Sequence, residues 1–250
     1  MTEEFPKLTS RQRQVAELIA EGCPVDEIAR ILEISKYTAS DHCKAVYRAF
    51  GFKTRIEAYP EIAKYAYTFG AKSLSFPHYT SSSINRMRIT NNGKTAVYFR
   101  SSECVCLSQS IEFYEEETFT DGDSTTIKMD GIEVPPFREI RGAVIYRYNY
   151  SKPIIFGETF RREVEIVYKD CFTGKTEDYW STLTQSPNLH GKFEILFDPP
   201  FQPEYVVMRF RHGDRKFEKE LTRGEGGFYI YEAVMMEYGS YYDFHWCAKA

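Results

Sequence analysis

The sequence has 250 residues, of which 42% are hydrophobic and 27% are charged, and its formal net charge is −4. This balance is typical of a globular protein and excludes a disordered or collagen-like chain. There is no apolar run of about 18 residues, and the acidic N-terminus carries no basic segment before an apolar stretch, so we expect a cytoplasmic protein without membrane contact.

The cysteine pattern favours reduced thiols. The six cysteines contain no CxxC pair, so we expect neither a disulfide framework nor a metal or cofactor; they are Cys23, Cys43, Cys104, Cys106, Cys171 and Cys247.

Two short helices are predicted first. Thr9 with Gln12 three residues later predicts the start of a helix over about residues 10–21. A second helix follows over residues 27–32, and a tight turn at Glu33-Ile34 ends it. The apolar residues that we expect to form the small core between these helices are Val15, Leu18, Ile19, Ile28, Ile31 and Leu32.

A third helix is predicted from Lys36, with Ser35 as its N-cap and Gly51 as its left-handed end. Helical spacing buries one face of it, formed by Ala39, Cys43, Val46 and Phe50. The opposite face is polar, and residues 34–56 hold five basic residues against one acidic residue. A polar helix face with this charge fits the major groove of DNA.

The spacing resembles the LuxR-type (GerE-like) helix-turn-helix domain of bacterial regulators, over about the first quarter of the chain. The matching residues are Leu8, Thr9, Arg11, Val15, Leu18, Ala20, Gly22, Glu27, Ile28, Ala29, Leu32, Ile34, Ser35, Thr38, His42, Gly51, Arg55 and Glu57. The resemblance implies that the third helix is the recognition helix and that Lys36, Thr38, Ser40, His42 and Lys44 touch DNA. Ser40 stands where the family usually has Lys, and Pro24 replaces the usual Ser cap of the second helix.

Double-stranded DNA is therefore the expected partner. The candidate DNA-binding residues are Lys36, Tyr37, Thr38, Ser40, Asp41, His42, Lys44, Arg48, Lys53 and Arg55. The alternative is a helical trio that contacts protein, with its Lys and Arg as a solvated face.

A fourth helix is predicted from a capping box at Thr54 and Glu57. Pro60 falls inside it, so the helix either kinks there or restarts at Pro60 and continues through Ile62 to Ala66. The resemblance implies that this helix forms a homodimer. Because Pro60 interrupts the helix, whether this dimer forms stays an open question.

The composition places domain boundaries at residues 1–68 for the helical domain, 69–83 for a linker rich in Gly and Ser, and 84–250 for a second domain. Beyond residue 84 the apolar period is two, and turn signals such as Asp130-Gly131 and His212-Gly213-Asp214 recur. We expect an α+β multidomain protein in which an all-α helix-turn-helix domain precedes an all-β antiparallel sandwich of about ten to twelve strands. An immunoglobulin-like form and a division into two units, 84–150 and 151–250, both remain open.

The second domain contains three groups of side chains that weakly suggest a metal site or a catalytic site. Asp243, His245 and Cys247 share one face of a strand, which could hold zinc or a Cys-His pair, although one flat strand rarely closes around a tetrahedral ion. Cys104 and Cys106 are better explained as small buried side chains. The acidic residues 115–117 and Asp121-Gly122-Asp123 resemble a calcium cage, but a solvated hairpin edge explains them better.

No phosphate loop, nucleophile elbow or zinc-protease motif is present, and we expect no catalytic residues. The prediction is a transcription regulator whose β domain senses a signal or contacts a partner. Two alternatives stay open, namely a scaffold in which the β domain is the working part and a switch in which its aromatic residues close on a small molecule.

Overall fold

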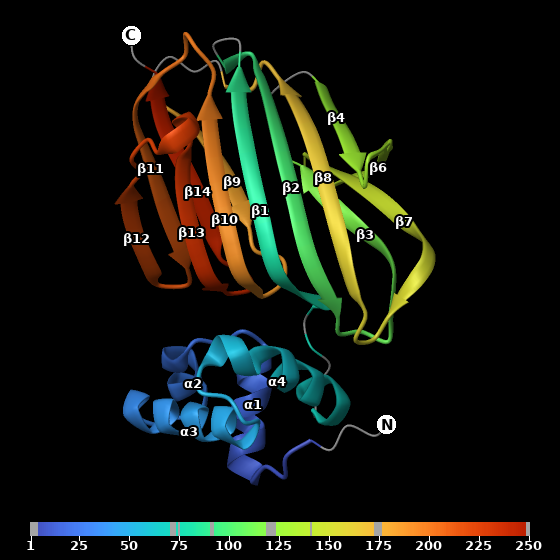
Figure 1. The fold of residues 1–250 in the computed structure, drawn as a ribbon, viewed down its shortest axis with the longest axis vertical. Helices are drawn as coiled ribbons and strands as arrows, with labels where there is room; N and C mark the ends of the chain where they lie inside the picture. The colour runs from blue at the N-terminus through green and yellow to red at the C-terminus, as the bar shows by residue number, and fades with distance from the viewer. Residues whose placement is uncertain are drawn as a thin grey trace.

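The computed structural model describes residues 5–70, 74, 76–90, 93–118, 124–140, 142–172 and 177–248. A four-helix domain packs against one end of a larger β domain (Figure 1). The helices are α1 (Ser10–Ala20), α2 (Val25–Ile31), α3 (Lys36–Ala49) and α4 (Arg55–Phe69). No helix in these ranges is long and apolar enough to cross a bilayer.

The helix boundaries follow the capping residues. Thr9 and Gln12 form a capping box on α1, and Thr54 and Glu57 form one on α4. Ser35 accepts the backbone N–H of Thr38 at 3.0 Å at the start of α3. Gly51 follows α3 with φ +84°, a left-handed conformation that costs glycine little. These predicted ends are confirmed.

Helix α4 runs through Pro60 as one element from Arg55 to Phe69, so it does not restart there. Proline has no N–H, and the helical bond that residue 60 would donate is lost. Extensive burial offsets this loss, because α4 contributes six buried side chains, which are Ala58, Tyr59, Ile62, Ala63, Tyr65 and Ala66.

The core of the helical domain differs from the prediction on two helices. Ile28 is fully buried, but Ile31 on the same helix is 44% exposed. On α3, Tyr47 is buried and Phe50 only half-buried, whereas the spacing predicted Phe50 in the core. Helix α2 is only seven residues long, so Ile31 lies at its last position, where the chain already turns toward α3.

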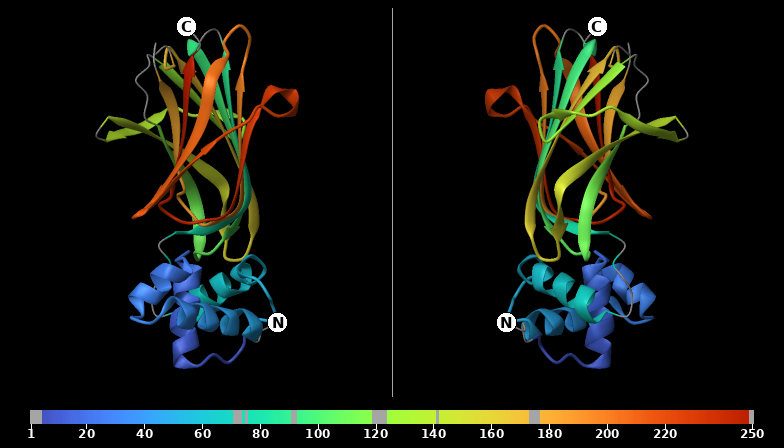
Figure 2. Two further views of the ribbon diagram at one scale, coloured as in Figure 1. Left: turned by 90° about the vertical axis from the view of Figure 1, so that its left-hand side faces the viewer. Right: turned by 90° about the vertical axis from the view of Figure 1, so that its right-hand side faces the viewer.

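The β domain is a two-layer sandwich in which one large sheet faces two smaller ones (Figure 2). The seven-stranded sheet has the order β13-β10-β1-β2-β8-β4-β5, and the smaller sheets are β12-β11-β14-β9 and β3-β7-β6. The strands are β1 (His78–Thr90), β2 (Thr95–Cys106), β3 (Ser110–Thr118), β4 (Ser124–Met129), β5 (Ile132–Glu133), β6 (Pro136–Ile140), β7 (Ala143–Ile155), β8 (Thr159–Lys169), β9 (Asp178–Leu183), β10 (Asn188–Phe197), β11 (Pro203–His212), β12 (Arg215–Glu220), β13 (Tyr229–Met236) and β14 (Tyr241–Ala248), with a 3₁₀ turn η2 (Glu225–Gly227) before β13.

Among the described strands every pairing is antiparallel except that of β1 with β10, which run parallel. The preceding strand β9 lies in the other layer, so β10 enters the large sheet without a hairpin and its direction is not tied to a neighbour. The large sheet contains strands from both 84–150 and 151–250, so these two segments share one sheet. Strand β1 begins at His78, inside the 69–83 stretch that the composition assigned to a linker.

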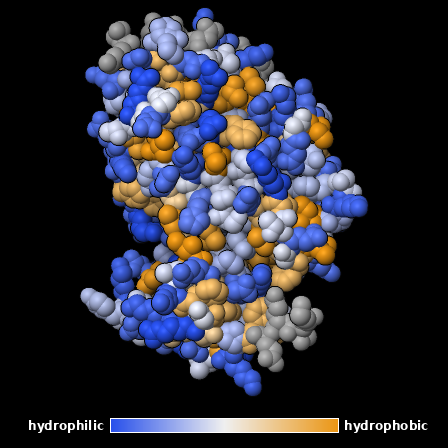
Figure 3. All heavy atoms as spheres, viewed as in Figure 1, coloured by the Kyte–Doolittle hydropathy of each residue, from blue (hydrophilic) through white to orange (hydrophobic). Residues whose placement is uncertain are grey.

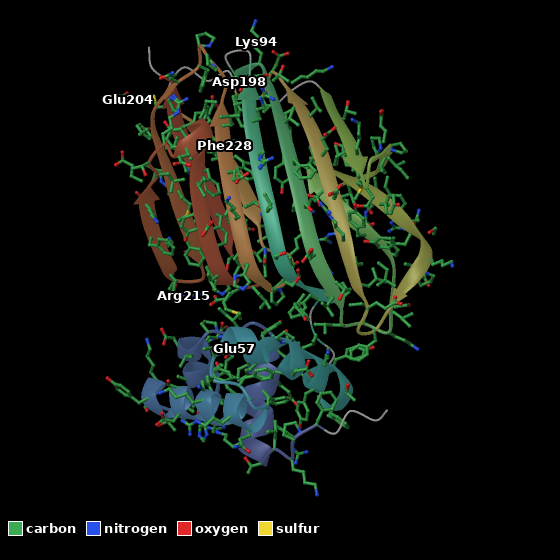
Figure 4. The ribbon with its side chains drawn as sticks, viewed as in Figure 1. Glu57, Lys94, Asp198, Glu204, Arg215 and Phe228 are labelled. Atoms are coloured by element: carbon green, nitrogen blue, oxygen red, sulfur yellow. The ribbon has the colours of Figure 1, made fainter. Side chains whose placement is uncertain are left out.

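One apolar core joins the two domains. The buried cluster of the helical domain continues into β-domain residues Phe76, Tyr79, Val105, Leu107 and Leu189. Tyr59 of α4 meets Tyr79 edge-on at 5.5 Å, and Tyr67 stacks on Phe156 at 4.6 Å. Lys94 and Asp198 mark the opposite end of the strands, far from Glu57 of α4 (Figure 4).

Ile28→Ala should lower the free energy of unfolding by about 2–5 kcal/mol, because it leaves a cavity in a packed core. Ile31→Ala, on the same helix, should change it by less than about 1 kcal/mol, because its side chain is largely exposed. Urea unfolding followed by helical circular dichroism measures both. Equal losses for the two variants would contradict the assigned burial.

Candidate nucleic-acid interface

The outward face of α3 is polar and uncovered. Its first turn presents Lys36, Tyr37 and Thr38, and the Tyr37 side chain is 85% exposed. Lys44 and Arg48 follow on the same helix, also exposed. The β domain lies against α4 and the end of α1, and α3 lies below them (Figure 1). Hydrophilic side chains cover this side of the helical domain in the space-filling view (Figure 3).

The turn between α2 and α3 is held by polar contacts. Arg11 of α1 donates to the carbonyl oxygen of Leu32 at 3.1 Å. Lys36 lies 2.8 Å from the carboxylate of Asp26, which ties the start of α3 to α2. The bond from Arg11 links α1 to the turn that precedes α3, and Arg11 is not among the candidate DNA-binding residues of the sequence analysis.

The basic side chains of α3 are weakly held. Lys44 pairs with Asp41 at 3.5 Å, and both side chains are more than half exposed. Exposed ion pairs of this kind contribute about 0–1 kcal/mol. Both Lys36 and Lys44 can therefore exchange a carboxylate for a phosphate at little cost.

Ser40 and His42 lie at the flank of this face. Both side chains are half-buried, while Asp41 between them is exposed. The structure thus groups Lys36, Thr38 and Lys44 on the open face. Ser40 and His42, the other two DNA contacts implied by the resemblance, lie at its margin.

Arg55 is the one candidate that turns inward, whereas Lys53 beside it is exposed. The Arg55 guanidinium donates to the carbonyl oxygen of Ile19 at 3.3 Å, and its Nε is buried without a hydrogen-bond partner. Burial raises the pKa of the Tyr47 hydroxyl and of the Cys43 thiol, and the charge of Arg55 opposes both shifts. Arg55 therefore lies beneath α3 and links α4 to α1.

Helix α4 has its apolar face occupied. Tyr59 donates to the carbonyl oxygen of Ala20 at 2.7 Å on one side and meets Tyr79 of the β domain on the other. The β domain therefore covers part of the helix through which the resemblance implies a dimer.

The candidate metal or catalytic side chains of the β domain have other partners or are buried. Asp243 accepts from Ser181 and from Arg211, and His245 lies 3.2 Å from Arg209 and 3.3 Å from Glu177. Cys104 and Cys106 are buried, as expected. Within the described ranges no group of three His, Cys, Asp or Glu side chains is placed to hold a metal ion.

The acidic run at residues 115–117 departs from the predicted solvated edge. Glu116 is only 6% exposed and forms an ion pair with Arg100 inside the sandwich, while Glu115 pairs with Arg138 and Arg147. Strand alternation turns the middle carboxylate inward, where it needs a cation. Asp121-Gly122-Asp123 lies outside the described residues.

Comparison with known proteins identifies the helical domain. Residues 6–61 match the family described as bacterial regulatory proteins of the luxR family (GerE). No curated protein matches the chain significantly.

Solved structures resemble the chain only loosely. Native yeast LTA4 hydrolase has a TM-score of 0.39 at 8% identity, over 67% of this chain and 29% of that one. A putative protease from Parabacteroides distasonis ATCC 8503 has a TM-score of 0.41 at 11% identity, over 68% and 40%. The chain spans less than half of the length of either, and likeness at this level indicates neither a shared fold nor a shared activity.

Arg55→Gln should lower the free energy of unfolding by about 1–3 kcal/mol, because the bond to Ile19 is lost in a buried setting. Under conditions in which this variant is folded, its affinity for DNA should stay within about twofold of that of the wild type. Lys53→Gln should show the reverse pattern, with unchanged stability and weaker DNA binding. Urea unfolding and fluorescence anisotropy on a duplex measure the two effects, and an Arg55→Gln protein that is stable but fails on DNA would overturn the assignment.

Proposed function

We propose, from the luxR-family helix-turn-helix domain that residues 6–61 form, that the chain is a sequence-specific transcription regulator that reads duplex DNA. The observation that carries this proposal is the uncovered polar face of α3, which lies on the side of the helical domain away from the β contact. An exposed helix with basic residues along it is the element that enters a major groove.

Each part of this face has a role in the proposal. Lys36, Tyr37 and Thr38 at the start of α3 reach base edges. Lys44 and Arg48, further along, neutralise phosphates and supply most of the salt-dependent affinity. Lys53 lies in the exposed turn after α3, where it adds a backbone contact.

We also propose that the β domain acts through the helical domain rather than by catalysis. Support comes from the shared apolar core, which makes α4 a partner of the β sheet. The polar groups that a hydrolase on β14 would use, Asp243 and His245, are already held by arginines. A homodimer remains part of the proposal, and its contacts lie outside the covered face of α4.

The test is selection of bound duplexes from a random pool by the purified full chain at near-physiological salt. The wild type should enrich a sequence. Lys44→Glu/Arg48→Glu should lose the enrichment and bind at least about tenfold more weakly, with a salt slope reduced by about two.

The matched control is Lys152→Glu/Lys216→Glu, which makes the same change in net charge on exposed β-domain lysines. It should bind as the wild type does. If both double variants lost DNA binding equally, binding would depend on overall charge only. If no sequence were enriched, the proposal that α3 reads DNA would be wrong. A palindrome among the enriched sequences would show that two copies of the protein bind the same duplex. The spacing of its half-sites would give the distance between the two copies.

A further inference from the structure

The interior of the sandwich changes from apolar to polar along its strands. At the end of the strands remote from the helical domain the large sheet turns Met87, Ile89 and Ile166 inward. Nearer the helical domain the inward positions are polar and still buried; they are Thr80, Ser83, Asn85, Ser102, Arg162 and Asn188. Buried polar groups require partners, so a polar interior of this size is costly unless it serves a purpose.

Most of this polar interior is internally satisfied. Asn188 donates to Ser83 at 2.7 Å, and Tyr98 donates to Asn85 at 2.9 Å. Arg100 is paired with the buried Glu116.

Arg162 is an exception. It is 7% exposed, and its guanidinium lies over the ring of Tyr114 at 5.3 Å. Its Nε has no hydrogen-bond partner, and no carboxylate within the described ranges forms an ion pair with it. Asp130 acts on it electrostatically, but that carboxylate accepts the backbone N–H of Glu163 at 2.8 Å.

A cavity of about 40 Å³ opens beside Arg162 and Arg100. Thr184 also lines it, is 7% exposed, and has an Oγ1 atom without a hydrogen-bond partner. Two side chains that are more than nine-tenths buried therefore bring unused donors to one small space. A volume of this size holds a few waters or one carboxylate group.

The cavity adjoins a groove of about 830 Å³ between the facing edges of β9 and β3. Arg100, Thr182, Leu183 and Gln185 line both spaces. The groove is rich in aromatic side chains, which are Tyr98, Tyr168, Phe172, Tyr179, Trp180, Phe210, Phe217 and Tyr241. Charged side chains line the groove as well, among them Glu117, Asp178, Arg211, Lys216 and Asp243. The aromatic part of its lining, next to a small cavity with a buried cation, matches a ligand with an apolar body and one anionic end.

We propose that the β domain binds an organic carboxylate, with the carboxylate group in the small cavity and the apolar body in the adjoining groove. Arg162 holds the carboxylate through charge-assisted hydrogen bonds, for which a guanidinium is well shaped. Thr184 donates a further bond from the other layer of the sandwich. One cation without an ion-pair partner selects a monoanion over a phosphate dianion.

The positive charge of this interior is also felt by His78. Burial holds the pKa of the His78 imidazole well below its usual value, and the charges of Arg162 and Arg100 lower it further. His78 reaches the cavity wall through Ser186, whose Oγ lies 3.3 Å from its Nε2. With this ring neutral, Arg162 and Arg100 are the charged side chains that line the small cavity.

The site concerns the β domain alone and is tested without DNA, so its failure and a failure of DNA binding are distinguishable. The measurement is the thermal unfolding midpoint of the full chain in acetate, benzoate, neutral benzamide or inorganic phosphate, all at equal ionic strength. A ligand that binds only the folded state raises the midpoint in proportion to its concentration and affinity. Benzoate should raise it most, acetate less, and benzamide not at all.

Arg162→Met should weaken benzoate binding by about tenfold or more, because the charge-assisted bonds are lost. Its fold should survive, since the substitution removes a buried charge that lacks an ion-pair partner, and burial of such a charge is costly. Arg161→Met is the matched control, because Arg161 is the neighbouring residue, faces outward and pairs with Glu163 at 2.6 Å. Thr184→Val provides a second variant in the cavity and should also weaken benzoate binding.

Three outcomes would overturn the proposal. One is the absence of any rise with both acetate and benzoate, which would leave the cavity to water alone. Another is an equal rise with benzoate in the wild type and in Arg162→Met. The third is a larger rise with phosphate than with either carboxylate, which would assign the cavity to a different anion.

Discussion

The packing of α4 against the end of the seven-stranded sheet is the interaction on which the rest of the molecule depends. Tyr59 is fully buried between Ala20 and Tyr79, so it belongs to both domains at once. Burial of a side chain of this size stabilises the folded state by about 1.5–3 kcal/mol, and several such residues line the contact. Because α4 and the end of α1 take this contact, the polar side of α3 is the part of the helical domain that is left free.

The β domain divides its interior between two kinds of environment. Aromatic rings pack together in one part, where the ring centroids of Phe193, Trp180 and Phe244 lie 5.2–6.2 Å apart. The part nearer the helical domain contains hydroxyl, amide and guanidinium groups instead. A buried charge with incomplete pairing is destabilising in an empty protein, and Arg162 is such a charge.

Much of this architecture could be predicted from short-range chemistry. The caps at Thr9, Ser35 and Thr54 depend on residues three positions apart, and the inward set Tyr242, Phe244 and Trp246 follows from the period of a strand. These features need no knowledge of the rest of the chain.

Features set by distant contacts were not accessible in this way. Arg55 looks like a surface cation in sequence, but its bond to Ile19 depends on how α4 crosses α1. Glu116 finds its cation on another strand, and the parallel entry of β10 depends on β9 having left the large sheet. The start of β1 at His78 was hidden because Ser and Thr, which are common in linkers, also fit a strand that alternates between a polar cavity and an apolar contact.

Strand β1 shows what that alternation means mechanically. Tyr79 packs into the core shared with α4, while its neighbours His78 and Thr80 belong to the polar interior. The strand is paired along its length with β2 on one side and β10 on the other, so it cannot slide past them. A ligand in the polar interior would therefore lie one residue along β1 from Tyr79, the side chain that contacts Tyr59 of α4.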